Sequence, residues 1–60
     1  MRSYRLYDLK DGRIISTAVF EASDDLAAID AARARNGFVD SELWCHSRLV
    51  AFIPATADPE

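Results

Sequence analysis

The dipeptide Asp11-Gly12 constrains the fold most, because it separates two runs rich in β-branched and aromatic residues. These runs are YRLY at residues 4–7 and IISTAVF at residues 14–20. Asp-Gly favours a tight hairpin turn, since glycine adopts positive φ without a steric penalty. We therefore predict an antiparallel hairpin over residues 4–22.

Two registers of this hairpin are open, a two-residue loop and a three-residue loop with a bulge at Gly12. We favour the bulged register because it gathers the bulkiest side chains on one face. In that register one face carries Tyr4, Leu6, Ile14, Ala18 and Phe20. The other face carries Arg5, Tyr7, Leu9, Ile15, Thr17 and Val19.

Residues 23–37, SDDLAAIDAARARNG, change from a two-residue period to a helical pattern. Ser23 is the expected N-cap, and Gly37 is the expected left-handed residue after the helix. Acidic residues near the start and arginines near the end suit the helix dipole. The expected core-facing side of this helix consists of Leu26, Ala28, Ile29 and Ala32.

Residues 42–53 return to strand character in two short runs, Glu42 to Cys45 and Arg48 to Ile53. His46-Ser47 separates the runs and predicts a second hairpin turn, and Pro54 ends the second run because proline has no N–H to donate. In a type I′ turn His46 would adopt positive φ. Trp44 would then lie opposite Leu49, and Cys45 opposite Arg48.

The whole pattern predicts an α+β fold of order ββαββ, an antiparallel four-stranded sheet with one helix packed on one face. The expected strand order across the sheet is 2-1-3-4. Residues 1–54 are expected to form a single domain, followed by a frayed tail at residues 55–60.

The composition argues against several classes of function. Seven Lys and Arg against ten Asp and Glu give a net charge of −3, which opposes binding to nucleic acid through phosphates. The longest apolar run, Leu49 to Ile53, is far shorter than the roughly 20 residues of a membrane helix. A lone cysteine forms no internal disulfide, and the chain start does not resemble a secretory signal, so we expect a cytoplasmic protein.

Trp44-Cys45-His46 contains the only tryptophan, cysteine and histidine of the chain. A Cys–His pair suggests a nucleophile and its base, but neighbouring strand residues point to opposite faces. A zinc site would need two chains to supply two Cys and two His ligands. The two glycines are isolated, so no phosphate-binding loop is present. We expect no enzyme, cofactor or metal, with a metal or catalytic site at Cys45 and His46 as a distant alternative.

A single helix covers one face of a four-stranded sheet, so the other face would expose many apolar side chains. Its candidate interface residues are Tyr7, Leu9, Ile15, Val19, Trp44 and Leu49. Depending on register, the second hairpin adds either Trp44, Leu49, Ala51 and Ile53 or Leu43, Val50 and Phe52. Such patches mark interfaces, and the same patch on an identical chain is self-complementary, so a homodimer is expected. The alternative is a monomer in which the long stems of Arg5 and Arg48 cover the face.

The segments YRLYDLKDGRI, FEASDD and ELWCHSRLV together resemble a loose group of short uncharacterised bacterial proteins. The resemblance covers Tyr4 to Ile53 and implies a ββαββ fold and a bacterial origin, but no activity. The group often has a glycine near the position of His46. A weaker similarity is to the HicB-like antitoxin fold, although this chain has no proline- and glycine-rich stretch after its second strand.

The expected function is that of a small, non-enzymatic, homodimeric protein-interaction module. The alternative is an antitoxin-like regulator that binds a toxin protein.

Overall fold

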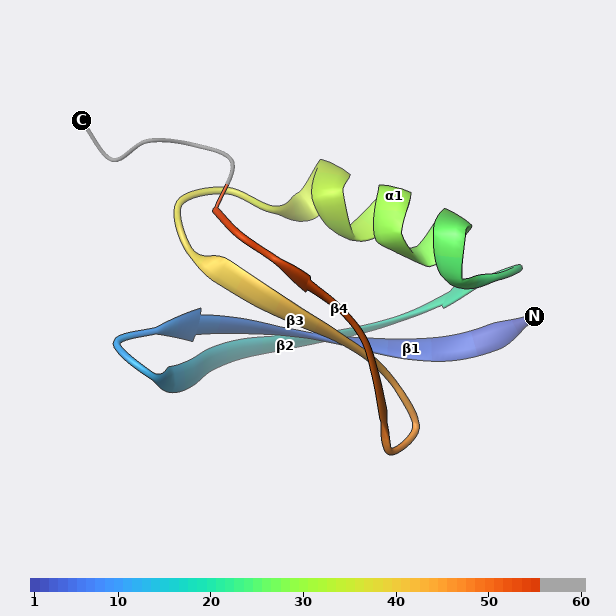
Figure 1. The fold of residues 1–60 in the computed structure, drawn as a ribbon, viewed down its shortest axis with the longest axis horizontal. Coiled ribbons are helices and arrows are strands. Elements are labelled where there is room, and N and C mark those ends of the chain that lie inside the picture. Colours follow the sequence, from blue (N-terminus) through green and yellow to red (C-terminus); the bar gives the residue numbers. More distant parts are fainter. Residues whose placement is uncertain (56–60) are drawn as a thin grey trace.

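A computed structural model of the chain describes residues 1–55, which form the predicted ββαββ order (Figure 1). The elements are β1 (Arg2–Lys10), β2 (Arg13–Ala22), α1 (Asp25–Arg35), β3 (Asp40–Cys45) and β4 (Arg48–Ile53). The strands form one antiparallel sheet in the order β2-β1-β3-β4, which confirms the predicted strand order. Helix α1 lies on one side of this sheet and contacts β2 and β4 (Figure 1).

Strand β4 ends at Ile53, directly before Pro54, as predicted. The predicted tail begins at Ala55, whose backbone N–H donates to the Asp40 carboxylate at 2.8 Å. Residues 56–60 of that tail lie outside the described residues.

The first hairpin combines features of both predicted registers. Its tip is a two-residue turn in which Lys10 lies opposite Arg13, and Asp11 and Gly12 have φ of 53° and 77°. Positive φ at both positions is the type I′ pattern, whose twist matches that of the strands. The predicted bulge at Gly12 is therefore wrong.

The extra residue of this hairpin is Ile15, because Asp8 pairs with Ser16 and Leu9 pairs with Ile14. Beyond this bulge the pairing is that of the favoured register, with Tyr4 opposite Phe20 and Leu6 opposite Ala18. Directly opposed residues share a face, so Ile14 lies on the face of Leu9. It does not join Tyr4 and Leu6, as the favoured register predicted.

Both ends of helix α1 differ from the prediction. Asp24 is the N-cap, and its carboxylate accepts a hydrogen bond from the Ala27 N–H at 2.8 Å. Ser23 lies one residue too early, and a carboxylate also interacts more favourably with the helix dipole than a hydroxyl does. At the other end Asn36 leaves the helix in an extended conformation, and Gly37 has no positive φ. The left-handed cap is absent because Asn36 takes the chain directly toward β3.

The core-facing side of α1 is narrow and built of alanine. Ala28 and Ala32 are fully buried, and Ala27 and Ile29 are packed beside the core. Leu26 was expected in this group but is 75% exposed. At 100° per residue Leu26 lies about 160° around the helix from Ala28, so it points to the opposite side.

The core lies between α1 and the sheet. Its sheet residues come from alternate positions of all four strands: Tyr4, Leu6, Ala22, Leu43, Cys45 and Ile53. The ring of Tyr4 stacks with that of Phe20, with 6.0 Å between the centroids. The period-two alternation that predicted the strands therefore also selects the face that α1 covers.

The second hairpin confirms the pairing of Trp44 with Leu49 and of Cys45 with Arg48. His46 has φ of 56°, but Ser47 is not in the positive region, so the turn is not of type I′. Strand β4 contains one extra residue, Val50, because Leu43 pairs with Ala51 while Trp44 pairs with Leu49. As a result Leu49 and Phe52 share the face without the helix, a combination that neither predicted alternative contained.

Candidate interaction surface

The helix-free face is the side of the sheet opposite α1. Its register positions, read across the cross-strand pairs, are Ser3, Arg5, Tyr7, Leu9, Ile14, Thr17, Val19, Glu21, Asp40, Glu42, Trp44, Leu49 and Phe52. It contains five of the six predicted interface residues, and the sixth, Ile15, is exposed at the adjacent bulge. Ile14 was predicted on the other face and Phe52 in only one of the two alternatives, because each owes its position to a bulge.

The apolar part of this face is exposed mainly at its two outer strands. More than half of the surface of each of Val19, Ile14, Ile15 and Phe52 is accessible, and Leu49 is 48% exposed. Tyr7, Leu9 and Trp44, on the two central strands, are half-buried. Apolar side chains are therefore present on all four strands of this face, and the most exposed of them lie on β2 and β4.

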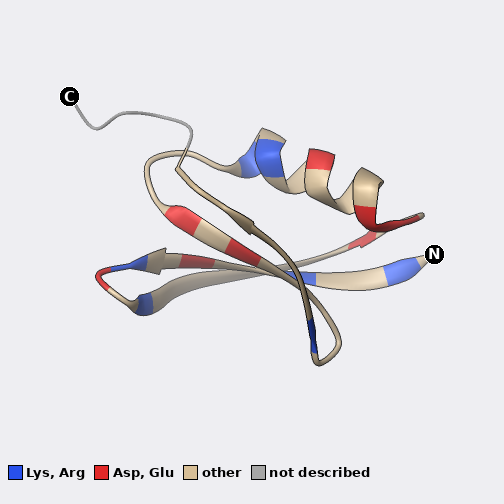
Figure 2. Cartoon of the chain, viewed as in Figure 1, with Lys and Arg blue, Asp and Glu red and all other residues tan. Residues whose placement is uncertain are grey.

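Four residues at the centre of this face form a group that we call the central quartet: Arg5, Tyr7, Glu42 and Trp44. Arg5 lies opposite Trp44 and Tyr7 lies opposite Glu42, on the central strands β1 and β3. The two charges therefore occupy diagonal corners and the two aromatic rings occupy the other corners. The charged residues of β3, Asp40 and Glu42, are both acidic, whereas Arg5 lies in the middle of β1 (Figure 2).

The two charges of the central quartet are held differently. The indole Nε1–H of Trp44 donates to Glu42 Oε1 at 3.1 Å, which orients the carboxylate on the face. The guanidinium of Arg5 is exposed and makes no hydrogen bond or ion pair within residues 1–55. The central quartet thus presents one oriented anion and one cation that has no hydrogen-bond or ion-pair partner among residues 1–55.

A shallow hollow of about 370 Å³ lies at one end of this face, lined by Ser3, Arg5, Tyr7 and His46. His46 therefore lies beside residues of the helix-free face. The thiol of Cys45, in contrast, is buried in the core under α1. The two neighbouring side chains are on opposite sides of the sheet, so the structure does not bring them together as a nucleophile and base.

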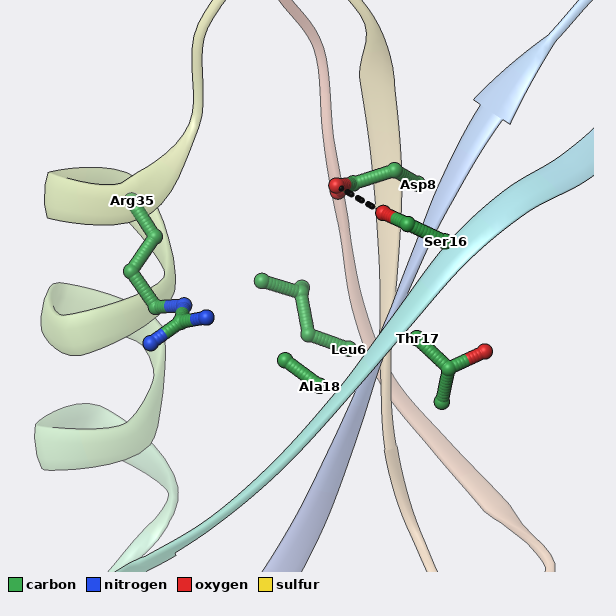
Figure 3. A pocket seen from close by; sticks show the side chains of 6 residues that line it. All are labelled: Leu6, Asp8, Ser16, Thr17, Ala18 and Arg35. Carbon is green, nitrogen blue, oxygen red and sulfur yellow. Dashed lines mark hydrogen bonds between the residues drawn. The ribbon is translucent and has the colours of Figure 1, made fainter.

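A second hollow, of about 490 Å³, lies on the helix side between the end of α1 and the β1–β2 hairpin (Figure 3). Leu6 and Ala18 line it with apolar atoms, and Arg35 extends from α1 toward it (Figure 3). The Asp8 carboxylate accepts hydrogen bonds from the Ser16 hydroxyl at 2.7 Å and the Ser41 hydroxyl at 2.8 Å. Both carboxylate oxygens are thus already engaged by hydroxyls of neighbouring strands.

Ser41 is the polar centre of a network that joins α1 to the sheet. It is fully buried, and its hydroxyl accepts from the Asn36 side-chain amide at 3.0 Å while donating to Asp8. The same amide donates to the Val39 carbonyl at 3.2 Å. Because buried polar groups are costly unless they are paired, this network fixes where α1 ends relative to β3.

A second polar link lies at the start of α1. The Tyr4 hydroxyl donates to Asp25 Oδ1 at 2.8 Å, and Arg48 Nη2 lies 3.3 Å from both Asp25 oxygens. The hydrogen bond from Tyr4, and then that from Arg48, lower the pKa of Asp25. Burial, followed by the bond to Asp25, raises the pKa of Tyr4.

The position of Arg48 corrects one expectation, since its ion pair with Asp25 places it on the helix side. The Arg48 stem therefore does not cover the helix-free face, and of the two arginines considered for that role only Arg5 lies there.

Two further properties hold for the described part of the chain. No three His, Cys, Asp or Glu side chains among residues 1–55 group together as a metal-binding cluster. The helix in the same residues is too short and too polar to cross a membrane. Comparisons with models of known protein families, with curated proteins and with solved structures give no match for this chain.

Proposed function

We propose that this chain is a small, non-enzymatic protein-interaction domain of the cytoplasm that forms a homodimer through the helix-free face. The observation that carries the proposal is the set of exposed and half-buried apolar side chains on all four strands that α1 leaves uncovered. Large exposed apolar patches with polar surroundings mark interaction sites in soluble proteins. The free thiol of Cys45 is in keeping with a reducing compartment.

The exposed apolar side chains set the strength of the proposed dimer. Ile14, Ile15, Val19, Leu49 and Phe52 are each about half exposed, so burying the rest of each contributes about 1 kcal/mol. A twofold dimer buries this set twice, which gives about 10 kcal/mol against an association cost of at least about 4 kcal/mol. The difference, about 6 kcal/mol at most, corresponds to a dissociation constant of about 40 µM or weaker.

Sedimentation of the full chain between about 1 and 500 µM tests this proposal, since the dimer fraction should rise across that range. Replacing Leu49 by Glu places a charge in the contact and should leave a monomer. Leu26→Glu is the matched control, because Leu26 is an equally apolar and more exposed leucine on the far side of α1. A monomeric wild-type chain at 500 µM, or equal effects of both substitutions, would contradict the proposal.

A further inference from the structure

We infer, on the basis of the proposed dimer, that the two copies are aligned by exchange of the charges of the central quartet. In this arrangement Arg5 of each copy pairs with Glu42 of the other copy. Tyr7 and Trp44 each lie near the same residue of the second copy.

The inference starts from the symmetry of two identical faces. When two sheets pack face to face, the twofold axis lies in the plane between them and exchanges positions on either side of it. The central quartet has Arg5 and Glu42 at one pair of diagonal corners and Tyr7 and Trp44 at the other. An axis that runs near the aromatic diagonal therefore brings Arg5 over Glu42 of the second copy, and Glu42 over its Arg5.

The other symmetric placements of the axis are less favourable. An axis along the charged diagonal brings Arg5 over Arg5 of the second copy and Glu42 over its Glu42, which creates two like-charge contacts. An axis parallel or perpendicular to the strands places each charge over an aromatic ring and leaves the carboxylates without cations. Charges buried without a partner destabilise an interface strongly. Electrostatics thus selects one alignment from the four.

The state of the charges in the single chain supports this selection. Glu42 is oriented by the Trp44 indole through Oε1, and Oε2 makes no hydrogen bond in the described chain. Arg5 is exposed on the same face without an ion-pair partner among residues 1–55. A guanidinium that pairs bidentately with a carboxylate adds orientation as well as affinity. Each copy therefore offers one donor and one acceptor in a self-complementary arrangement.

The arrangement around the quartet is also compatible with a dimer contact. Val19 lies beyond Arg5 on β2, and Leu49 lies beyond Trp44 on β4. Apolar side chains at both sides would exclude water from the ion pairs, which strengthens them.

The test exchanges the charges one at a time. Arg5→Glu places two Glu–Glu contacts in the dimer, and Glu42→Arg places two Arg–Arg contacts there. Each variant alone should weaken the dimer by at least about 100-fold. The double variant R5E/E42R should recover most of the wild-type dissociation constant.

The decisive arm is an equimolar mixture of the two single variants. Each chain alone is then monomeric, but in the mixed dimer both contacts again join Glu to Arg, so a heterodimer should form. A pairing within one chain would be restored in the double variant but not in the mixture. Sedimentation with one variant fluorescently labelled distinguishes the heterodimer directly.

Circular dichroism melts check that every variant still folds. Because Glu42→Arg removes the acceptor of the Trp44 indole, a milder cycle of R5Q, E42Q and R5Q/E42Q is measured in parallel. The two single neutral variants should each weaken the dimer by roughly tenfold, and the double should be no weaker than either single. A wild-type dimer that is insensitive to all these changes would overturn the alignment while leaving the dimer intact. A monomeric wild type would overturn the proposed function itself.

Discussion

Replacing Ser41 by alanine tests whether the polar network beneath α1 holds the domain together. The substitution removes one buried oxygen and almost no volume, so its effect reports on hydrogen bonding and not on packing. The Asn36 amide loses an acceptor at 3.0 Å, and Asp8 loses a donor at 2.8 Å. Asp8 keeps Ser16, and Asn36 keeps the Val39 carbonyl.

The size of the effect follows from the burial of Ser41, which is 0% exposed. Loss of a hydrogen-bond partner at a buried site costs about 1 to 3 kcal/mol, so we expect a loss of about 2 kcal/mol in the free energy of unfolding. A core of this size supplies only about 3 to 5 kcal/mol in total. For a small domain the loss corresponds to a fall of roughly 8 to 16 °C in Tm.

Ser16→Ala is the matched control, because the Ser16 hydroxyl donates to the same carboxylate but Ser16 is exposed. Its cost should stay within about 0.5 kcal/mol. Thermal and urea unfolding followed by Trp44 fluorescence, at one protein concentration, measures both variants. Equal losses for Ser41→Ala and Ser16→Ala would refute the reasoning, because burial would then not determine the cost.

Two further predictions concern the dimer and acid stability. Trp44→Ala should raise the dissociation constant of the proposed dimer by more than about 30-fold while the monomer keeps its circular dichroism spectrum, because central aromatic residues dominate interfaces. A dimer indifferent to this change would show that Trp44 is not in the contact. Because the pKa of Asp25 is lowered in the folded chain, its ionised carboxylate should contribute its full stabilisation at pH values above its ordinary pKa of 3.8. This contribution should be lost as the pH falls through the lowered pKa. Tyr4→Phe removes the hydrogen bond that contributes most to lowering the pKa of Asp25. The urea midpoint, measured from pH 2 to 7, should therefore fall less steeply in acid for this variant than for the wild type. An unchanged slope would contradict the role of Tyr4.

The elements and their order could be predicted because they depend on local signals. The Asp11-Gly12 turn, the period-two runs and Pro54 each act within a few residues of the chain. The helix ends were less predictable, since Ser23 and Asp24 are adjacent and both are good N-cap residues, so the local sequence does not separate them. Leu26 was misplaced because a helix rich in alanine has few large side chains to define its buried side.

The helix-free face could be predicted only where strict alternation holds. Tyr7, Val19 and Trp44 follow that alternation, and the structure places them where the pattern does. Phe52 departs from it because Val50 adds one residue to β4, and Ile14 departs because Ile15 does the same in β2. A bulge changes the face of every later residue, and its position depends on the partner strand, which the local sequence does not contain.

The two bulges have a consequence for how copies of this chain can meet. Both extra residues, Ile15 and Val50, lie in β2 and β4, which are the outer strands of the sheet. An outer strand with regular hydrogen-bonding groups is a template on which another chain can add a strand, and a bulge interrupts that template and twists the edge. With both borders irregular, growth into an endless ribbon of paired sheets is disfavoured. In the proposed dimer, by contrast, contact through the broad helix-free face uses the same surface on both copies and ends with the pair.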